Sequence, residues 1–164
     1  FNTRREDMTG KPLKYISVGK LKTPFWKDAA AHYTTRITRW RKRDITEVRD
    51  GDSALPQDQR NALEGRRIIE ALDPQDIALV LDERGQHLTS PQLADLLRQM
   101  DHDARGRACF VIGGAWGLDE AVRQRASRCI SLSHMTLPHE LARVVLLEQL
   151  YRAECILRKV PYHH

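Results

Sequence analysis

Two short apolar runs, each closed by turn-forming residues, constrain the fold of this chain more than any other feature. Residues 77–81 are IALVL and residues 108–112 are ACFVI, and neither run alternates between polar and apolar side chains. Such runs are typical of strands that are buried on both faces of a sheet. Because stretches with helical spacing follow both runs, we predict an α/β fold with a mostly parallel sheet.

Three further strands and five helices complete the predicted pattern. The strands are expected over residues 14–18, 44–48 and 129–132. The helices are expected over residues 24–40, 57–72, 90–100, 119–126 and 138–158. Ser90 is expected to cap the third helix, because its hydroxyl precedes a proline. In the second helix, Ala62, Ile69 and Leu72 are expected to form the buried side.

The last predicted helix is apolar on nearly all sides of its middle, from Leu141 to Leu150. A helix that is apolar all round is buried all round. In a domain of this size, we therefore predict that it packs against a second subunit. Glu148 in this helix is either the ion-pair partner of an arginine or part of a solvated stripe.

The length of 164 residues corresponds to one domain, with 41% apolar and 30% charged residues. We predict this domain over residues 13–164, after a disordered extension over residues 1–12. The longest aliphatic run, residues 144–147, is far shorter than the ~20 apolar residues of a membrane span. No secretory signal is visible, and the three cysteines lie far apart without a C-x-x-C pair. We expect a cytoplasmic protein with no membrane segment and no metal.

Basic residues are concentrated at the start of the chain. Residues 1–43 contain 12 Lys and Arg against 3 Asp and Glu, whereas residues 44–164 contain 15 against 19. The first helix is expected to carry Lys27, Arg36, Arg39 and Arg41 opposite its apolar side. This basic face either binds a polyanion such as RNA or is simply solvated.

Ligands of open α/β sheets bind beyond the carboxyl ends of the strands. Three loops qualify, after Leu81, Ile112 and Leu132. Residues 113–118, GGAWGL, are either a tight turn or a loop that approaches a ligand closely. Residues 131–139, SLSHMTLPH, either cap the last helix or clamp a flat heterocycle with backbone groups. No G-x-S-x-G motif accompanies the serines of this loop, which disfavours a hydrolase.

Five segments together carry a resemblance to a known family. They are KYISVGKLK, LVLDERGQHLTS, FVIGGAWGL, SLSHMTLPHELARVVLLEQLYRA and PYHH, in this order. Over residues 13–164 the chain resembles the RlmH (YbeA-like) family of SPOUT methyltransferases. The resemblance implies an α/β knot with a C-terminal deep trefoil, and a homodimer. It also implies an S-adenosylmethionine-dependent 23S rRNA (pseudouridine-N3)-methyltransferase that acts on helix 69 in assembled 70S ribosomes.

The resemblance also assigns site residues. The positions that match cofactor contacts are Leu81, Gly113, Leu132, Ser133, His134, Met135, Thr136 and Leu137. Arg152, Tyr162 and His163 match positions for substrate binding and catalysis. The chain departs from its relatives at His164, where Lys or Arg is common. Other possibilities are a SPOUT methyltransferase that acts on tRNA, a non-catalytic ribosome-binding assembly factor and a nucleotide-binding module.

Overall fold

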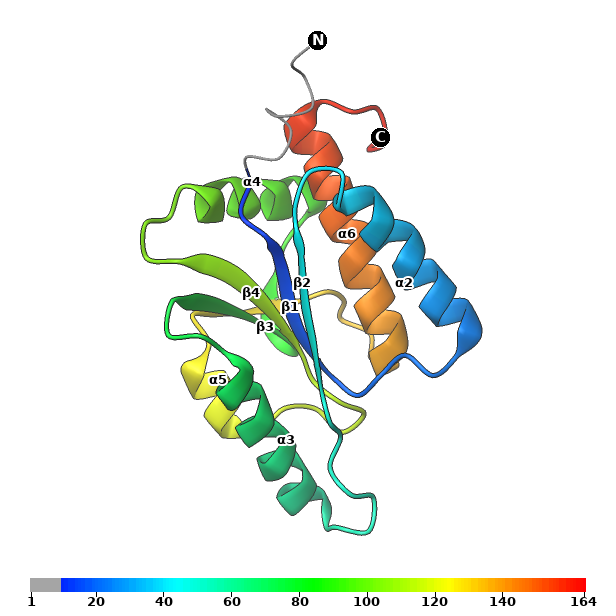
Figure 1. Ribbon diagram of the computed structural model, residues 1–164, viewed down its shortest axis with the longest axis vertical. Helices are drawn as coiled ribbons and strands as arrows, with labels where there is room; N and C mark the ends of the chain where they lie inside the picture. The colour runs from blue at the N-terminus through cyan, green and yellow to red at the C-terminus, as the bar shows by residue number, and fades with distance from the viewer. Residues whose placement is uncertain (1–9) are drawn as a thin grey trace.

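A computed structural model describes residues 10–164 and contains one five-stranded sheet (Figure 1). The strands, in chain order, are β1 (Leu13–Val18), β2 (Arg43–Val48), β3 (Asp76–His87), β4 (Arg107–Ile112) and β5 (Arg128–Ser131). They lie in the order β2-β1-β4-β3-β5, and every neighbouring pair is parallel. The predicted α/β fold with a parallel sheet is therefore confirmed.

Helices cover both faces of the sheet (Figure 1). They are α2 (Pro24–Ile37), α3 (Gln57–Ala71), α4 (Ser90–Asp101), α5 (Glu120–Arg125) and α6 (His139–Arg158). The helices α2, α4 and α6 pack on one face, and α3 and α5 pack on the other. Within β3, Leu79 enters the first core and its neighbours Ala78 and Val80 enter the second. Burial on both faces explains why the apolar run does not alternate.

Two local predictions about the helices are wrong. The buried residues of α3 are Glu64, Gly65 and Ile68, whereas Ala62 and Ile69 are exposed. This face is set by close contact with α5, since a Cβ on Gly65 would lie 2.8 Å from the Cβ of Asp119. Such an approach requires the absence of a side chain, which apolar spacing does not reveal.

The cap of α4 is Thr89 and not Ser90. The Thr89 hydroxyl accepts a hydrogen bond from the backbone N–H of Gln92 at 3.2 Å, and the Gln92 side chain accepts one from the Thr89 N–H at 2.8 Å. This reciprocal arrangement satisfies two N–H groups at once, which favours Thr89 over its neighbour. Ser90 instead donates to Gln149 of α6 at 2.6 Å.

The strand β3 extends six residues beyond its predicted end at Leu81. Leu81 and Gln86 both pair with Ile130 of β5, so the predicted turn over residues 82–85 is a bulge within the strand. A bulge of this kind keeps the strand paired while it projects side chains from the sheet.

The helix α6 lies between α2 and α4 of its own chain and contacts the sheet through β4. Its apolar sides are thus largely covered without a second subunit, and the homodimer stays a prediction. The trefoil knot also stays a prediction. Of the predicted extension over residues 1–12, residues 1–9 lie outside the described part of the chain. Between residues 10 and 164, none of the helices is both long and apolar enough to cross a membrane.

Candidate active site

A cleft of about 760 Å³ opens at the carboxyl end of the sheet, a volume typical of cofactor and small-molecule sites. Three segments supply most of its lining: the β3 bulge, the glycine loop (residues 113–118) and the β5–α6 loop (residues 132–138). These are the three strand ends that the sequence indicated. Ala142 of α6 also lines the cleft.

Seven of the eight residues that the resemblance assigns to the cofactor line this cleft. They are Leu81, Gly113, Leu132, Ser133, Met135, Thr136 and Leu137. The eighth, His134, does not line it. Its exposed imidazole stacks on that of His87, with 3.6 Å between the ring centroids. These positions place the residues around one cleft and do not by themselves identify its ligand.

Short-range hydrogen bonds shape the β5–α6 loop. The hydroxyl of Ser131 donates to the carbonyl of Ser133 at 2.9 Å, and the Ser133 hydroxyl accepts from the N–H of Met135 at 2.9 Å. The serines therefore satisfy backbone groups of the loop itself. What the loop offers a ligand is its remaining backbone and its apolar side chains, including Met135, which is 78% exposed.

The glycine loop makes a tight reversal between β4 and α5. Gly114 and Gly117 form an antiparallel bridge, and the N–H of Gly117 donates to the carbonyl of Gly114 at 3.2 Å. Gly117 has a φ of +89°, a conformation that glycine adopts without strain. A Cβ on Gly113 would lie 2.9 Å from the Leu118 side chain, so glycine is also required there for space.

A charged pair between the β3 bulge and α5 is part of the lining that the sequence prediction missed. Asp82 accepts a hydrogen bond from Arg123 of α5 at 2.6 Å and one from the N–H of Arg84 at 3.1 Å. Burial alone would raise the pKa of Asp82, but these hydrogen bonds lower it below its ordinary value. Asp82 is therefore ionised at neutral pH. Its position directly after the apolar run at residues 77–81 was the signal that could have identified it.

The three predicted catalytic residues lie together, Arg152 in the last turns of α6 and Tyr162 and His163 after its end. Arg152 donates to Nδ1 of His163 at 3.2 Å, and its guanidinium lies 4.7 Å from the centre of the Tyr162 ring. Glu148 joins them, accepting from Arg152 at 2.7 Å and from the Tyr162 hydroxyl at 3.1 Å. We call Glu148, Arg152, Tyr162 and His163 the tail cluster. The predicted ion pair of Glu148 with an arginine is thereby confirmed, although Glu148 is half-buried and not fully buried.

The tail cluster fixes the protonation of two of its members. Burial, together with the nearby Glu148 carboxylate, raises the pKa of Tyr162 to about 12, so the phenol stays neutral at physiological pH. The hydrogen bond to Glu148 raises the pKa of Arg152 further above its ordinary value. Since Arg152 can only donate, Nδ1 of His163 accepts, and the proton of the neutral ring lies on Nε2.

The tail cluster and the cleft lie at opposite ends of α6. The helix begins beside the cleft and runs back toward the amino ends of the strands, where the chain ends (Figure 1). From Ala142 to Arg152 the helix axis rises about 15 Å, at 1.5 Å per residue. Within one chain, the structure therefore gathers the predicted cofactor residues and the predicted catalytic residues into two separate sites.

Comparison with known proteins identifies the family. The family model described as "Predicted SPOUT methyltransferase" matches residues 12–163. A protein of Desulfovibrio desulfuricans named "Ribosomal RNA large subunit methyltransferase H" is 80% identical over 157 residues, which cover 96% of this chain and all of the relative. The chain belongs to the RlmH family of SPOUT methyltransferases. A protein of the same name from Nitratidesulfovibrio vulgaris is 57% identical over 94% of this chain and 99% of its own length.

Solved structures share the SPOUT fold. A probable methyltransferase from Bordetella pertussis superposes with a TM-score of 0.60 at 18% identity, covering 93% of this chain and 99% of that structure. A probable rRNA-methyltransferase from Porphyromonas gingivalis gives 0.51 at 10% identity, covering 91% and 71%. At these identities the likeness concerns the fold alone.

The basic surface of this SPOUT methyltransferase differs from the prediction at one residue. Lys27 and Arg39 are exposed, as expected, and so is Lys42. Arg41, by contrast, is buried and donates to Asp101 and Glu154. The helix α2 ends at Ile37, so Arg41 does not continue its solvent face. Arg41 is thus part of the interior and unavailable to a phosphate.

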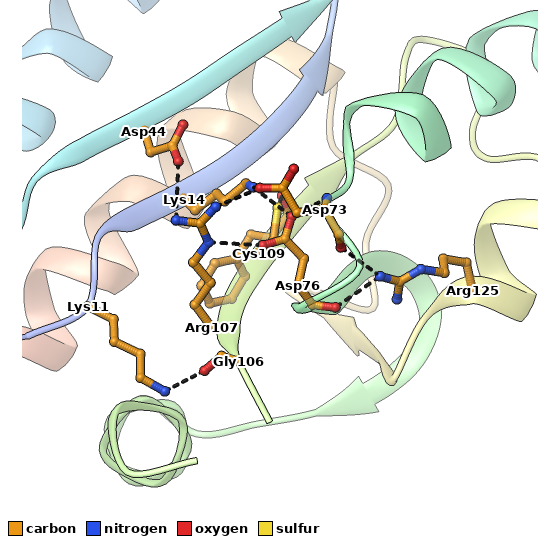
Figure 2. Close-up of polar contacts among 10 residues, drawn as sticks. Lys11, Lys14, Asp44, Asp73, Asp76, Gly106, Arg107, Cys109 and Arg125 are labelled. Carbon is orange, nitrogen blue, oxygen red and sulfur yellow. Dashed lines mark hydrogen bonds and ion pairs between the residues drawn. The ribbon is translucent and has the colours of Figure 1, made fainter. Parts of the chain in front are cut away.

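A second polar cluster lies at the amino end of the sheet (Figure 2). The ammonium of Lys14 lies 2.6 Å from Asp76 and 3.0 Å from Asp73, and Arg107 bridges the same two carboxylates at 3.1 and 2.7 Å. Arg125 donates to the backbone carbonyl of Asp76 at 3.0 Å. Cations and carboxylates satisfy one another here, so the cluster joins the starts of three strands and offers no free acid or base.

The thiol and metal chemistry of the described residues is also limited. Burial raises the pKa of the Cys109 thiol to about 12, which keeps it protonated and unreactive. Within residues 10–164, no three His, Cys, Asp or Glu side chains are grouped as metal ligands.

Proposed function

We propose that this SPOUT methyltransferase transfers a methyl group from S-adenosylmethionine to N3 of a pseudouridine in helix 69 of 23S rRNA, in assembled 70S ribosomes. The observation that carries the rRNA substrate is 80% identity over the full length of a relative named for large-subunit rRNA methylation. The nucleotide, the stem-loop and the ribosomal state follow from the family resemblance.

The cleft fits the proposed cofactor. It combines apolar side chains such as Leu81 and Leu137 with the exposed backbone of two loops, which suits a flat adenine ring. A Cβ on Gly113 would already contact Leu118 and the carbonyl of Gly117, so the backbone itself forms this wall of the cleft. Leu81, Gly113, Leu132, Ser133 and residues 135–137, which line the cleft, are proposed to hold S-adenosylmethionine. When bound, its sulfonium supplies an electrophilic methyl group.

The tail cluster is proposed to act on the pseudouridine base. N3 is protonated at neutral pH, and this proton leaves as the N3–methyl bond forms. Arg152 is proposed to stabilise the negative charge that develops on the base, and Tyr162 to orient it. His163 is proposed to take the proton. Because its Nδ1 accepts from Arg152, this role requires substrate to displace the Arg152 contact.

A homodimer is proposed to bring the two sites together. Reacting atoms must approach to about 3–3.5 Å, whereas roughly 15 Å of α6 separate Ala142 of the cleft from Arg152. The tail cluster of one chain would then serve the cleft of its partner. Mixed dimers of His163→Ala and a cleft variant, Gly113→Val, are expected to regain activity that neither variant has alone. No recovery in mixed dimers would contradict this arrangement.

The main experiment is methyl transfer from labelled S-adenosylmethionine to particles from a strain that lacks the modification. Assembled 70S ribosomes, 50S subunits and bulk tRNA are compared, and the product nucleoside is identified by mass. Label as N3-methylpseudouridine in 70S ribosomes is the expected result. Label in tRNA alone would overturn the substrate, and ribosome binding without any label would favour an assembly factor.

Replacement of His163 by Ala tests the assigned chemistry. We expect turnover to fall by about 100-fold or more, the usual contribution of a general base, with S-adenosylmethionine affinity unchanged. His102→Ala is the matched control, because His102 is an exposed imidazole at the end of α4. Unchanged turnover in His163→Ala would remove this residue from the mechanism.

A further inference from the structure

One turn and a half of α3, directly behind the glycine loop, contains polar atoms that lack partners. In the described residues, the buried side-chain atoms without a hydrogen bond are Ser17 Oγ, Arg60 Nε, Asn61 Oδ1 and Glu64 Oε1. Three of these four belong to α3. A buried polar atom without a partner destabilises the protein, and a charged group does so most, so the carboxylate of Glu64 has the greatest need of a donor.

Glu64 lies between two loops. Its side chain is buried, with only 4% of the residue exposed. One oxygen, Oε2, accepts from the N–H of Gly51 at 2.8 Å. The other, Oε1, lies beside the glycine loop, because a Cβ added to Gly114 would lie 3.0 Å from it. The free oxygen of Glu64 therefore faces the rear of a loop whose front lines the cleft.

The same stretch of α3 holds the glycine loop at Trp116. Asn61 donates to the carbonyl of Trp116 at 3.3 Å, and the guanidinium of Arg60 lies 5.8 Å from the centre of its ring. The indole is otherwise open to solvent, at 55% exposure. The loop thus rests on α3 at two points, with Oε1 of Glu64 between the helix and Gly114.

We propose that Glu64 is a positioning residue for the cofactor, and this inference rests on the proposed binding of S-adenosylmethionine in the cleft. When the cleft is filled, Oε1 accepts a hydrogen bond from the N–H of Gly114 or Ala115, the two amides that flank the Gly114 Cα. A carboxylate is required because its two oxygens can accept from the N–H of Gly51 and from the glycine loop at the same time. Glutamine has the same shape but turns a donor toward one of the two N–H groups.

The test compares Glu64→Gln with Glu70→Gln, which removes an exposed carboxylate from the same helix. Calorimetry is used to measure S-adenosylmethionine binding well below the melting temperature of each variant. We expect Glu64→Gln to bind about tenfold more weakly, the loss of one charge-assisted hydrogen bond, and to raise KM for S-adenosylmethionine equally. KM for ribosomes is expected to stay unchanged. Glu64→Asp, which keeps both acceptors, is expected to recover part of the affinity.

Trp116 reports the position of the loop. The change in its fluorescence on addition of S-adenosylmethionine is obtained as the difference between each protein and the same protein carrying Trp116→Phe. This change is expected to shrink in Glu64→Gln and to persist in Glu70→Gln. A residue that only supports the fold would lower the melting temperature without affecting this signal.

The outcomes distinguish failure of the proposed function from failure of the role proposed for Glu64. If the unmodified protein does not bind S-adenosylmethionine, the proposed function fails and this inference fails with it. If it binds and Glu64→Gln binds equally well, the inference alone is overturned. A lower melting temperature with unchanged affinity would make Glu64 a structural residue, which also overturns it. If Glu64→Gln does not fold, Glu64→Asp decides, because its carboxylate is one methylene shorter and cannot reach both Gly51 and the glycine loop as well. Partial loss of affinity in Glu64→Asp then supports the inference, and full affinity contradicts it.

Discussion

Replacement of Arg41 by Met should destabilise the fold strongly, although the sequence predicts that this residue lies on an exposed basic face. The Arg41 guanidinium donates to both oxygens of Asp101 at 2.7 Å, to Glu154 and to the carbonyl of Lys11 at 2.9 Å. Methionine fills similar space but leaves two carboxylates without their main partner. The loss of stability in Arg41→Met therefore comes from uncompensated buried charge and not from a cavity.

The magnitude follows from the partners that remain. Removing one member of a buried ion pair costs about 3–5 kcal/mol. Glu154 keeps Arg158 at 3.0 Å, and the Asp101 side chain is 23% exposed. We therefore expect the lower end, about 3 kcal/mol of unfolding free energy. For a domain of this size that corresponds to a melting temperature lower by roughly 6–12 °C.

The deficit should depend on pH. Burial alone would raise the pKa of Asp101, but the hydrogen bonds from Arg41 outweigh it and the folded-state pKa is lowered. A carboxylate with a lowered pKa stabilises the fold above its unfolded pKa of about 3.9, and this contribution is lost as pH falls through the folded pKa. The deficit of Arg41→Met should thus be greatest at neutral pH and shrink below about pH 4.

Urea unfolding followed by circular dichroism at pH 7 and pH 3.5 measures this deficit. Lys42→Ala is the matched control, since Lys42 is the exposed neighbour and its loss should change stability by no more than about 0.5 kcal/mol. For ribosome binding we expect the larger effect in Lys42→Ala and not in Arg41→Met. Lys42→Ala should weaken the affinity for ribosomes and flatten its dependence on salt. Equal stability of the two variants, or a deficit that does not change with pH, would refute the assignment of Arg41 to the interior.

Two further predictions concern a helix start and two glycines. Glu140 of α6 accepts hydrogen bonds from the Thr23 hydroxyl at 2.7 Å and from the Thr23 N–H at 3.2 Å, and these bonds lower the pKa of Glu140. Glu140→Ala should therefore lower the unfolding free energy by about 1 kcal/mol at pH 7 and by less below about pH 4. Equal losses at pH 7 and pH 3.5 in urea unfolding would contradict this. A Cβ on Gly106 would lie 1.6 Å from the carbonyl oxygen of Gln75, whereas one on Gly117 meets nothing within 4 Å. Gly106→Ala should therefore cost about 3 kcal/mol and Gly117→Ala only about 1 kcal/mol of backbone strain, and equal melting temperatures would refute the distinction.

The elements that could be predicted are those whose burial appears in local spacing. The run at residues 77–81 is apolar without alternation because both faces of β3 are covered, and the structure confirms this. The buried side of α3 could not be found in this way. It depends on Gly65 and Glu64, one without a side chain and one charged, and both are buried through contacts with distant segments.

The candidate site likewise has a part that could be predicted from the sequence and a part that could not. The rule that ligands bind beyond the carboxyl ends of parallel strands located the three loops, because strand order and direction follow from the fold class. Charged residues were harder to place, since charge indicates a need for a partner and not where that partner lies. Arg41 and Glu64 look solvated in sequence, yet each is satisfied or held by groups more than ten residues away.

The helix α6 shows what an apolar pattern can and cannot establish. Its all-round apolarity correctly predicted burial, but α2 and α4 of the same chain supply most of the cover. Periodicity indicates that a face is covered and never which chain covers it. The case for a partner must therefore rest on the proposed function: the proposed cofactor cleft lies at the start of α6, and Arg152, a proposed catalytic residue, lies about 15 Å further along its axis. Methyl transfer between these two proposed sites would require a much shorter separation. Either the last residues move or a second chain contributes them, and mixed dimers distinguish these two arrangements because only the second restores activity in trans.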